Sequence, residues 1–489
     1  MIAKQIVEAA SVPRRPGLYC LGPFPRRVSF SAQQYRALNL VWALHEENRL
    51  KEDSEVAVIG AGLAGLTAAA AFAGYGCKVD LYDQTSATMS KQRHTYHRMV
   101  HPSVNQWPER ELSFTTELPF LEWYAGACSD IVQTVTDEFA KLPQVTFFSN
   151  HEATDVVTVA TDRLGLYLEP ARTPRPSYDL VMLTIGFGEE GGGAFPPIDY
   201  WTADSLESLR EKGGIHFIVS GCGDGGLIDA LRLVHTNLRR GRLIFETAAA
   251  LSGTPIAEAI KGAERKVEVT LDLNTLKTTY EQCAALLDED SRYADIAKSL
   301  SASYVQKATL VFLLDRRHER PYSLRAAPIH KLMVAHALRA GMITYYQGEV
   351  TDQGGKIVAG GRTFDPHKCQ VIVRHGASAK FGRLLGEDEI LELKNKQKAL
   401  ADHYATKLWT DPYPVPRDYP AHDTRSKKFA EHRRKWAVRA VRQISPDANV
   451  ALTPDGYEVS FAPPIPADAP DRLFGVSVKS IITPQIEVS

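Results

Sequence analysis

The sequence predicts an α/β fold built from two parallel-sheet units, with a helical extension before them and a capping segment after them. Short apolar runs typical of buried strands alternate with helical patterns along most of the chain, which favours a parallel sheet covered by helices. Two of these runs end in glycine-rich turns that open helices, at 60–65 and 221–226. The composition is that of a globular protein, since 44% of the residues are hydrophobic and 24% are charged.

We expect four segments along the 489 residues, a length that suits about two to four domains. Residues 1–50 form the N-terminal extension, 51–200 the first unit and 201–378 the second unit. Residues 379–489 complete the first unit or cap the cleft. In the extension, Ser31 can cap an amphipathic helix whose apolar stripe comprises Tyr35, Leu38, Leu40, Val41 and Leu44.

Sequence patterns place the strands and helices of each unit. The first unit is expected to hold a strand at 56–59, a helix at 63–72, a strand at 78–83 and a strand-rich stretch at 145–186. The second unit is expected to hold a strand at 215–220, a helix at 227–238, a strand at 242–246, a helix at 329–340, and strands at 342–348 and 370–376.

The first glycine-rich turn has the G-x-G-x-x-G spacing of a Rossmann-like dinucleotide site. Gly60 permits a tight turn, Gly62 lets the backbone approach a pyrophosphate, and Gly65 lets the helix and strand pack closely. The N-terminus of the following helix offers free N–H groups and a positive dipole end to phosphates. Asp83 ends the next strand, where its carboxylate can accept hydrogen bonds from ribose hydroxyls. The alternative is a glycine-rich turn that is only structural.

The stretch around this turn resembles the FAD-binding turn of flavoproteins that have two dinucleotide-binding domains. It reads V-x-V-I-G-A-G-L-A-G-L-T-A-A and precedes a strand ending in an acid. The stretch from Tyr178 to Gly186, Y-D-L-V-M-L-T-I-G, is similar to a second FAD-associated segment, Y-D-x-x-x-x-A-x-G. The resemblance implies that Gly186 lets the chain pass close to the flavin. The R-x-G-G element often found after the second strand is absent, so the subfamily is left open.

The second glycine-rich turn repeats the spacing of the first. Gly221, Gly223 and Gly226 follow a strand run and open a helix. The stretch resembles the NAD(P)H-binding turn of thioredoxin-reductase-like and flavin-monooxygenase-like proteins. An Asp also occurs in that turn in some of those relatives, so Asp224 need not repel phosphates. The alternative is a degenerate nucleotide fold that keeps only the architecture.

The choice between NADH and NADPH is left open by the residues near the second turn. Glu246 ends the expected strand at 242–246 and takes the position that Asp83 has in the first unit, which favours the unphosphorylated ribose of NADH. Arginines nearby could instead serve the 2′-phosphate of NADPH; they are Arg239, Arg240 and Arg242.

The densest group of ionisable and aromatic residues lies at 93–107, after the second strand of the first unit. In the related folds this segment approaches the flavin. The resemblance therefore implies that Arg98 and His101 lie at the flavin edge, where Arg or His can stabilise the reduced ring or relay protons, and that Trp107 lines the pocket. The alternative is a loop of satisfied, solvated charges. The strand end at 374–376 could also reach the cleft.

Several classes of function are disfavoured by the sequence. The net charge is -1, from 57 Lys plus Arg against 58 Asp plus Glu, so no nucleic-acid partner is expected. The six cysteines are scattered without a C-x-x-C pair, which disfavours a disulfide framework and a dithiol reductase. No zinc-type His/Cys spacing is present, and no metal is expected. The Baeyer–Villiger fingerprint is absent, and the basic segment at 425–442 is expected to be a solvated helix.

Taken together, these features predict an FAD-dependent oxidoreductase that uses NAD(P)H as electron donor. The expected acceptor is a small organic substrate or oxygen, which leaves a monooxygenase open. The alternatives are an FAD-dependent oxidase or dehydrogenase without nicotinamide, and a non-catalytic FAD- or NAD-binding sensor or assembly module. No secretory signal is apparent and the longest apolar run, 66–74, is too short to span a bilayer, so a cytoplasmic location without membrane contact is expected. A homo-oligomer is left open.

Overall fold

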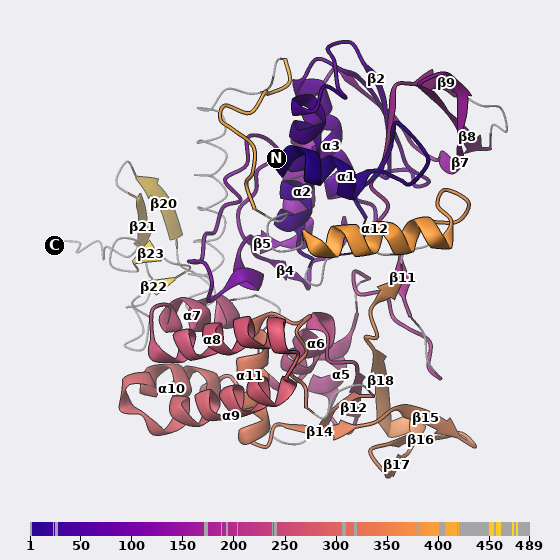
Figure 1. Cartoon of the computed structure of the whole chain (residues 1–489). Coiled ribbons are helices and arrows are strands. Elements are labelled where there is room, and N and C mark those ends of the chain that lie inside the picture. The colour runs from indigo at the N-terminus through magenta and orange to yellow at the C-terminus, as the bar shows by residue number, and fades with distance from the viewer. Residues whose placement is uncertain are drawn as a thin grey trace.

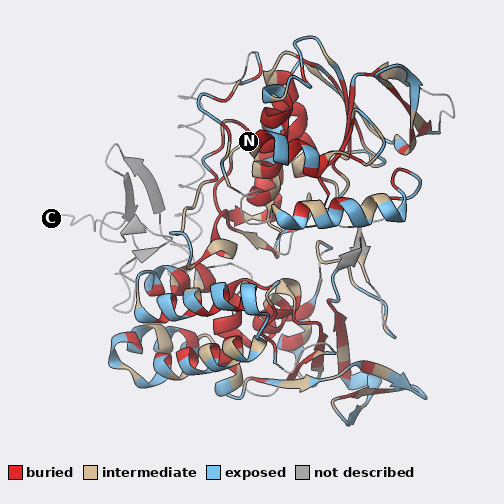
Figure 2. Cartoon of the chain, viewed as in Figure 1, coloured by how far each residue is buried: buried red, intermediate tan, exposed pale blue. Residues whose placement is uncertain are grey.

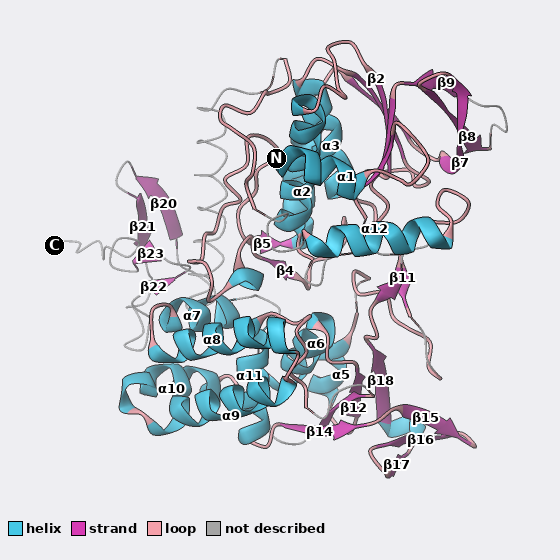
Figure 3. Cartoon of the chain, in the orientation of Figure 1, coloured by secondary structure: helices cyan, strands magenta, loops and turns pink. Residues whose placement is uncertain are grey.

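The protein is described by a computed structural model (Figure 1). The described residues are 2–22, 24, 28–170, 175–186, 188–191, 194–202, 204–236, 238, 242–305, 310–316, 320–378, 381–400, 406–417 and 419, with short strands at 449–453, 456–460, 472–473 and 476–477. The basic segment at 425–442 and the arginines Arg239 and Arg240 lie outside the described residues. The described residues form two main parallel sheets with helices around them, as the sequence predicts (Figures 1 and 3).

The first sheet has five parallel strands in the order β1-β10-β2-β3-β6. Its strands are β1 (Leu18–Cys20), β2 (Glu55–Ile59), β3 (Lys78–Tyr82), β6 (Val145–Phe148) and β10 (Leu180–Leu183). Both faces of β2 are buried, because Val56 and Val58 join one apolar core while Ala57 and Ile59 join another. Burial on both faces is typical of parallel sheets and explains the near-continuous apolar runs.

The N-terminal extension is part of the first unit and is not purely helical. Its helices α1 (Ile2–Ala10) and α2 (Phe30–Glu46) pack on each other, and α2 packs on α3 (Leu63–Gly74). Between them, β1 pairs with β10 at the edge of the sheet. The expected cap of α2 is wrong by two residues, since Ser29 Oγ accepts from Ala32 N at 3.1 Å.

Smaller elements complete the first unit. Between β6 and β10 along the chain, three strands form an antiparallel sheet of their own. They are β7 (Glu152–Ala160), β8 (Arg163–Glu169) and β9 (Arg175–Tyr178). The segment between β3 and β6 contains β4 (Met99–Val100), β5 (Gly126–Ala127) and α4 (Cys128–Phe139). Later in the chain, α12 (Glu387–Ala399) packs against α1.

The second sheet has four parallel strands in the order β14-β13-β12-β18. They are β12 (His216–Ser220), β13 (Val311–Asp315), β14 (Ile343–Gln347) and β18 (Cys369–Val373). The helices α5 (Leu206–Lys212), α6 (Asp224–Val234) and α11 (Pro328–Arg339) pack around it, and an antiparallel sheet extends it with β15 (Val350–Gln353), β16 (Lys356–Ala359) and β17 (Arg362–Phe364). Two short strands, β11 (Glu189–Glu190) and β19 (Ala377–Ser378), pair where the chain passes between the units.

The strand expected at 242–246 is wrong, because these residues begin helix α7 (Arg242–Leu251). The buried side chains of α7 include Ile244, Phe245, Ala248 and Leu251, a spacing of a helix face and not of a strand. Three more helices follow before β13: α8 (Pro255–Thr270), α9 (Leu273–Glu289) and α10 (Ala294–Ala302). We call α7–α10 the helical insertion.

Burial follows this architecture (Figure 2). The helix α3 and the strands β12, β13 and β18 of the second sheet are mostly buried, whereas α8, α9 and α12 each present an exposed face. Among the described residues, no helix taken alone has the length and apolarity to cross a bilayer, and one pair bent by 95°, Leu243–Leu251 with Pro255–Thr270, meets the criterion only when combined.

Candidate functional site

The first glycine-rich turn joins β2 to α3, and its three glycines have distinct surroundings. Gly60 has φ +106°, and a Cβ there would lie 3.0 Å from the backbone oxygen of Thr184 on the neighbouring strand segment. At Gly65 a Cβ would lie 1.8 Å from Gly60 O, so only glycine lets α3 pack this closely. At Gly62 nothing lies within 4 Å of the Cβ position. The middle glycine therefore faces open space, as close approach of a pyrophosphate requires.

The first N–H groups of α3 lie at this open turn. Gly62 is the residue that caps α3, and it has no side chain to accept from the first turn of the helix. Asp83 follows β3, and its Oδ2 accepts from Ala61 N at 2.7 Å. Its Oδ1 accepts from Thr85 N at 2.8 Å. The carboxylate is thereby fixed beside the turn, in the position that a ribose-binding acid takes.

The second turn, between β12 and α6, repeats this geometry. Gly221 has φ +120°, and a Cβ there would lie 2.0 Å from Arg374 O at the end of the neighbouring β18. At Gly226 a Cβ would lie 1.9 Å from Gly221 O, while at Gly223 nothing lies within 4 Å. Gly223 caps α6 without a side chain, as Gly62 caps α3. Both turns thus present an open cradle of backbone N–H groups that fits a dinucleotide pyrophosphate.

The acid that partners the second turn is Asp315, which sequence reasoning missed. Asp315 ends β13, and its Oδ2 accepts from Cys222 N at 3.1 Å, as Asp83 accepts from Ala61 N. Glu246, expected in this role, lies on α7 and ends no strand. The missed signal is the apolar run at 311–314 followed by an acid, which the helical insertion moves far along the chain from α6.

Asp224 sits at the first position of α6 and is held by the protein itself. Its Oδ1 accepts from Ala327 N at 2.8 Å and lies 2.7 Å from Nδ1 of His330. This carboxylate ties the second turn to the N-terminus of α11, which begins at Pro328. Asp224 therefore links the second turn and α6 to the start of α11.

Gly186 lies just beyond β10, beside the first turn. The hydroxyl of Thr184 donates to the carbonyl oxygens of Ile59 and Gly60, at 2.9 and 2.8 Å, which holds this segment against the turn. Gly186 is exposed, and nothing lies within 4 Å of its Cβ position. This placement agrees with close passage of a ligand, and contact with a flavin stays a prediction.

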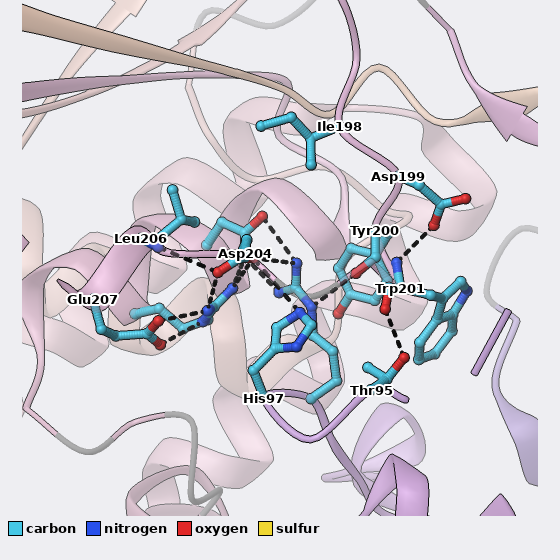
Figure 4. A network of polar contacts seen from close by, with 12 residues as sticks. Thr95, His97, Ile198, Asp199, Tyr200, Trp201, Asp204, Leu206 and Glu207 are labelled. Carbon is cyan, nitrogen blue, oxygen red and sulfur yellow. Dashed lines mark hydrogen bonds and ion pairs between the residues drawn. The ribbon is translucent and has the colours of Figure 1, made fainter. Parts of the chain in front are cut away.

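Arg98 is buried in a network of ion pairs (Figure 4). It is 2% exposed, and its guanidinium donates to both carboxylate oxygens of Asp229 on α6. Its Nε donates to the backbone oxygen of Tyr200 at 3.1 Å. These partners occupy the side chain, so the structure gives it a bridging position between units; contact with a flavin stays a prediction.

His101 and Trp107 are also buried, on the side of the second unit. His101 is 3% exposed and lies between the rings of Phe114 and Phe245, with centroids 4.9 and 4.5 Å away. Burial lowers the pKa of His101 to about 3, so it is neutral at pH 7. Trp107 is 1% exposed and belongs to the core of the second unit, where its Nε1 donates to Ser252 Oγ at 3.3 Å. The roles expected of His101 and Trp107 at a flavin stay predictions.

Of the two residues that follow β18, the first is buried and the second is exposed. Arg374 is 4% exposed and its Nε donates to Asp229 at 2.8 Å, so it belongs to the network of Arg98. His375 is exposed, and its Nε2 lies 2.8 Å from the hydroxyl of Ser220, the residue before Gly221. The segment 374–376 is expected from the sequence to reach the cleft. In the structure, His375 lies beside the second turn, whereas the side chain of Arg374 lies in the interior.

Comparisons with known proteins give one family match and several similar solved structures. A family model described as an NAD(P)-binding Rossmann-like domain matches residues 58–102, which include the first turn and Asp83. Similar solved structures include a bacillithiol disulfide reductase from Staphylococcus aureus (TM-score 0.39, 12% identity, 68% of this chain and 79% of that one) and thioredoxin reductase from T. acidophilum (TM-score 0.32, 14% identity, 68% and 80%). OTEMO in complex with FAD and NADP is also similar (TM-score 0.34, 12% identity, 69% and 74%). A search of curated proteins gives no match.

Proposed function

We propose that this chain, whose residues 58–102 match a model of Rossmann-like dinucleotide-binding domains, binds two dinucleotides and acts as a flavin oxidoreductase. FAD occupies the turn at Gly62, as the resemblance of the two flanking segments implies, and NADH or NADPH occupies the turn at Gly223. When both are bound, the nicotinamide supplies a hydride and the flavin ring accepts it. The acceptor of the electrons is a small organic molecule or oxygen.

The single observation that carries this proposal is the equivalence of the two turns. In each, the first glycine meets the end of a neighbouring strand segment, the middle glycine has no atom within 4 Å of its Cβ position, and the third glycine packs on the first. In each, a strand-end carboxylate accepts from the residue after the first glycine. A turn kept for architecture alone has no need for an open middle glycine and an uncapped helix.

The chain's own groups have defined tasks in this proposal. The N–H groups at the starts of α3 and α6 bind the pyrophosphates, and the helix dipoles add to that attraction. Asp83 and Asp315 hold the turns and offer oxygens to ribose hydroxyls. His375, exposed beside Ser220, is available to a nucleotide at the second turn.

A small or gaseous acceptor is proposed because a dithiol relay has no sequence support. Such a relay needs two thiols close together, and the six cysteines include no C-x-x-C pair. In the structure, all six are buried and unpaired.

The experiment is anaerobic titration of the purified protein with NADPH and, in parallel, NADH, followed by visible absorbance. Both coenzymes are needed because the end of β13 carries an acid, Asp315, and then Arg316, and these side chains favour opposite ribose forms. Bleaching of a bound flavin supports the proposal. A flavin that stays oxidised with both coenzymes contradicts it and favours an oxidase or a sensor.

Glycine substitutions test which turn holds which nucleotide. Gly62→Glu places a carboxylate in the first cradle, so we expect flavin-free protein. Gly223→Glu does the same in the second cradle, so we expect normal flavin content and at least about a hundredfold loss in reduction by NAD(P)H. Gly262→Glu is the matched control, because Gly262 lies in α8 with open space around it and far along the chain from either turn. Unchanged reduction in Gly223→Glu contradicts the assignment.

A further inference from the structure

A buried group of charges lies where the two units meet. Asp229, on α6, is fully buried and accepts hydrogen bonds from three arginines, which are Arg98, Arg232 and Arg374. Arg232 also donates to Asp204 and Glu207 at distances of 2.7–2.9 Å. We call these six residues the Asp229 cluster: Arg98, Asp204, Glu207, Asp229, Arg232 and Arg374. Figure 4 shows polar contacts in this region, with Asp204 and Glu207 labelled.

The cluster is electrically balanced, and each charge in it has at least one opposite charge as a partner. It holds three arginines and three carboxylates, all with little or no exposure. Burial by itself raises the pKa of Asp229, but Arg98, Arg374 and Arg232 outweigh burial and hold that pKa well below its usual range. Removing one partner of a buried ion pair leaves an uncompensated charge, which is strongly unfavourable.

Arg98 is the one member that comes from the first unit. It lies between β3 and β4, in the segment that leaves the first sheet, whereas the other five members lie at 204–374. Its fork reaches both oxygens of Asp229, and its Nη2 lies 3.7 Å from Asp204. The bond to Asp229 therefore crosses from one unit to the other. Thr95, nearby, donates to Trp201 O at 2.6 Å, in the segment that leads from β11 to α5.

The same arginine is linked to the second glycine-rich turn through Tyr200. The guanidinium of Arg98 stacks on the Tyr200 ring, 3.8 Å from its centroid. On the turn itself, a Cβ at Gly225 would lie 3.1 Å from Cε2 of Tyr200, so the ring rests against the turn. Arg374 adds another link, because its carbonyl oxygen packs against Gly221 while its side chain binds Asp229. Arg98 is thus connected to the turn through packed groups.

We propose that Arg98 is a positioning residue, which locks the second glycine-rich turn in one orientation relative to the first unit. This proposal rests on the proposed function for its kinetic consequence, since a nucleotide at the second turn must be aligned with one at the first. The lock acts through the bonds to Asp229 and the stacking on Tyr200. This positioning role needs no contact between Arg98 and either dinucleotide.

The test measures alignment separately from binding. In anaerobic stopped-flow experiments with NADPH and NADH, Arg98→Met is expected to keep its flavin content and its coenzyme Kd, while the limiting rate of flavin reduction falls by about tenfold to a hundredfold. Arg98→Lys keeps the charge but loses the two-pronged bond, so a smaller loss in the same direction is expected. Arg232→Met is the matched control, because it removes a buried cation whose carboxylate partners all lie on the second unit, and we expect lower stability with a nearly normal limiting rate.

Calorimetry of the same variants tests the connection between the units without measuring enzyme activity. We expect one unfolding transition for the natural protein and two for Arg98→Met, because the variant loses the buried ion pair between the units and keeps the exposed pair of Glu109 with Arg265. The variant Arg98→Met with Asp229→Asn restores neutrality and serves if the single variant folds poorly. Equal losses of stability in Arg98→Met and Arg232→Met, with one transition and an unchanged limiting rate, would overturn the proposal. If neither coenzyme reduces the flavin of the natural protein, the proposed function fails, and the number of transitions alone decides the lock.

Discussion

At the scale of single residues, three histidines with strongly lowered pKa values make the folded state sensitive to mild acid. Burial lowers the pKa of His101 to about 3. Burial, assisted by His336, lowers that of His235 to about 3. Burial, assisted by Arg98, lowers that of His97 to about 4. In the unfolded chain each histidine has a pKa near 6.5, so the unfolded state binds more protons throughout the interval between these values.

Stability is therefore expected to be complete above about pH 6.5 and to fall as the pH decreases toward 4. Each fully neutral buried histidine contributes a slope of up to about 1.4 kcal/mol per pH unit in this window. Urea unfolding at half-unit steps from pH 7.5 to 4.5 measures the slope. His101→Asn should reduce it, because Oδ1 of asparagine can still accept from Ser103 N but does not titrate. A pH-independent free energy of unfolding above pH 5 contradicts the prediction.

The comparison of Asp315 with Glu246 shows what a residue pattern can miss. Both are acids that follow apolar residues, and the spacing from the second turn favours Glu246. The structure selects Asp315, because only β13 lies beside β12 with its carboxyl end at the turn. Pairing between strands, rather than distance along the chain, decides which acid meets the turn.

At the scale of elements, the helical insertion is fastened by a buried polar contact. Glu264 on α8 accepts at Oε1 from Lys331 Nζ on α11 and from the Tyr280 hydroxyl on α9, both at 2.5 Å. Lys331 is fully buried and Glu264 is 4% exposed. Three helices thus meet at one carboxylate oxygen, which fixes the insertion on the second unit.

Glu264→Gln is expected to lower the free energy of unfolding by about 3–5 kcal/mol, because it removes the carboxylate charge that pairs with the buried Lys331 ammonium. Glu258→Gln on the same helix is the control: its carboxylate is 63% exposed and lies 3.7 Å from Lys261 Nζ, so a change within about 0.5 kcal/mol is expected. Denaturant unfolding measures both. Similar values for the two variants would show that Lys331 finds compensation elsewhere.

At the scale of the whole molecule, the six cysteines report on global opening. They are distributed over both units and all are buried. Burial raises the pKa of Cys20, and likewise of Cys77 and Cys369, to about 12, so little thiolate is present at pH 8. The full set is Cys20, Cys77, Cys128, Cys222, Cys283 and Cys369.

We expect a colourimetric thiol reagent to modify fewer than about one thiol per chain in the native protein and all six after unfolding in urea. The rate of native labelling should then follow the rate of global unfolding. Rapid modification of one thiol in native buffer would show local opening at that position, and mass spectrometry of the labelled peptide would identify it.

The sequence by itself determined the local parts of this molecule. The turns at 60–65 and 221–226, the strands that lead into them and the helices that follow are encoded within about 25 residues each, because glycine spacing, strand burial and helix periodicity are local properties. The α/β class and the two parallel sheets follow from the alternation of these parts. The expected helices at 63–72 and 329–340 are confirmed as α3 and α11.

Only the tertiary structure decided the long-range relations. It added β1 to the first sheet, identified α7–α10 as an insertion, moved the second acid to Asp315, and placed Arg98 and Trp107 in contact with the second unit. These outcomes depend on which strands pair and on which buried charges find partners across more than 100 residues of chain. Sequence periodicity carries no record of such distances, because burial of a charge becomes favourable only after its counter-charge has been brought to it by the fold.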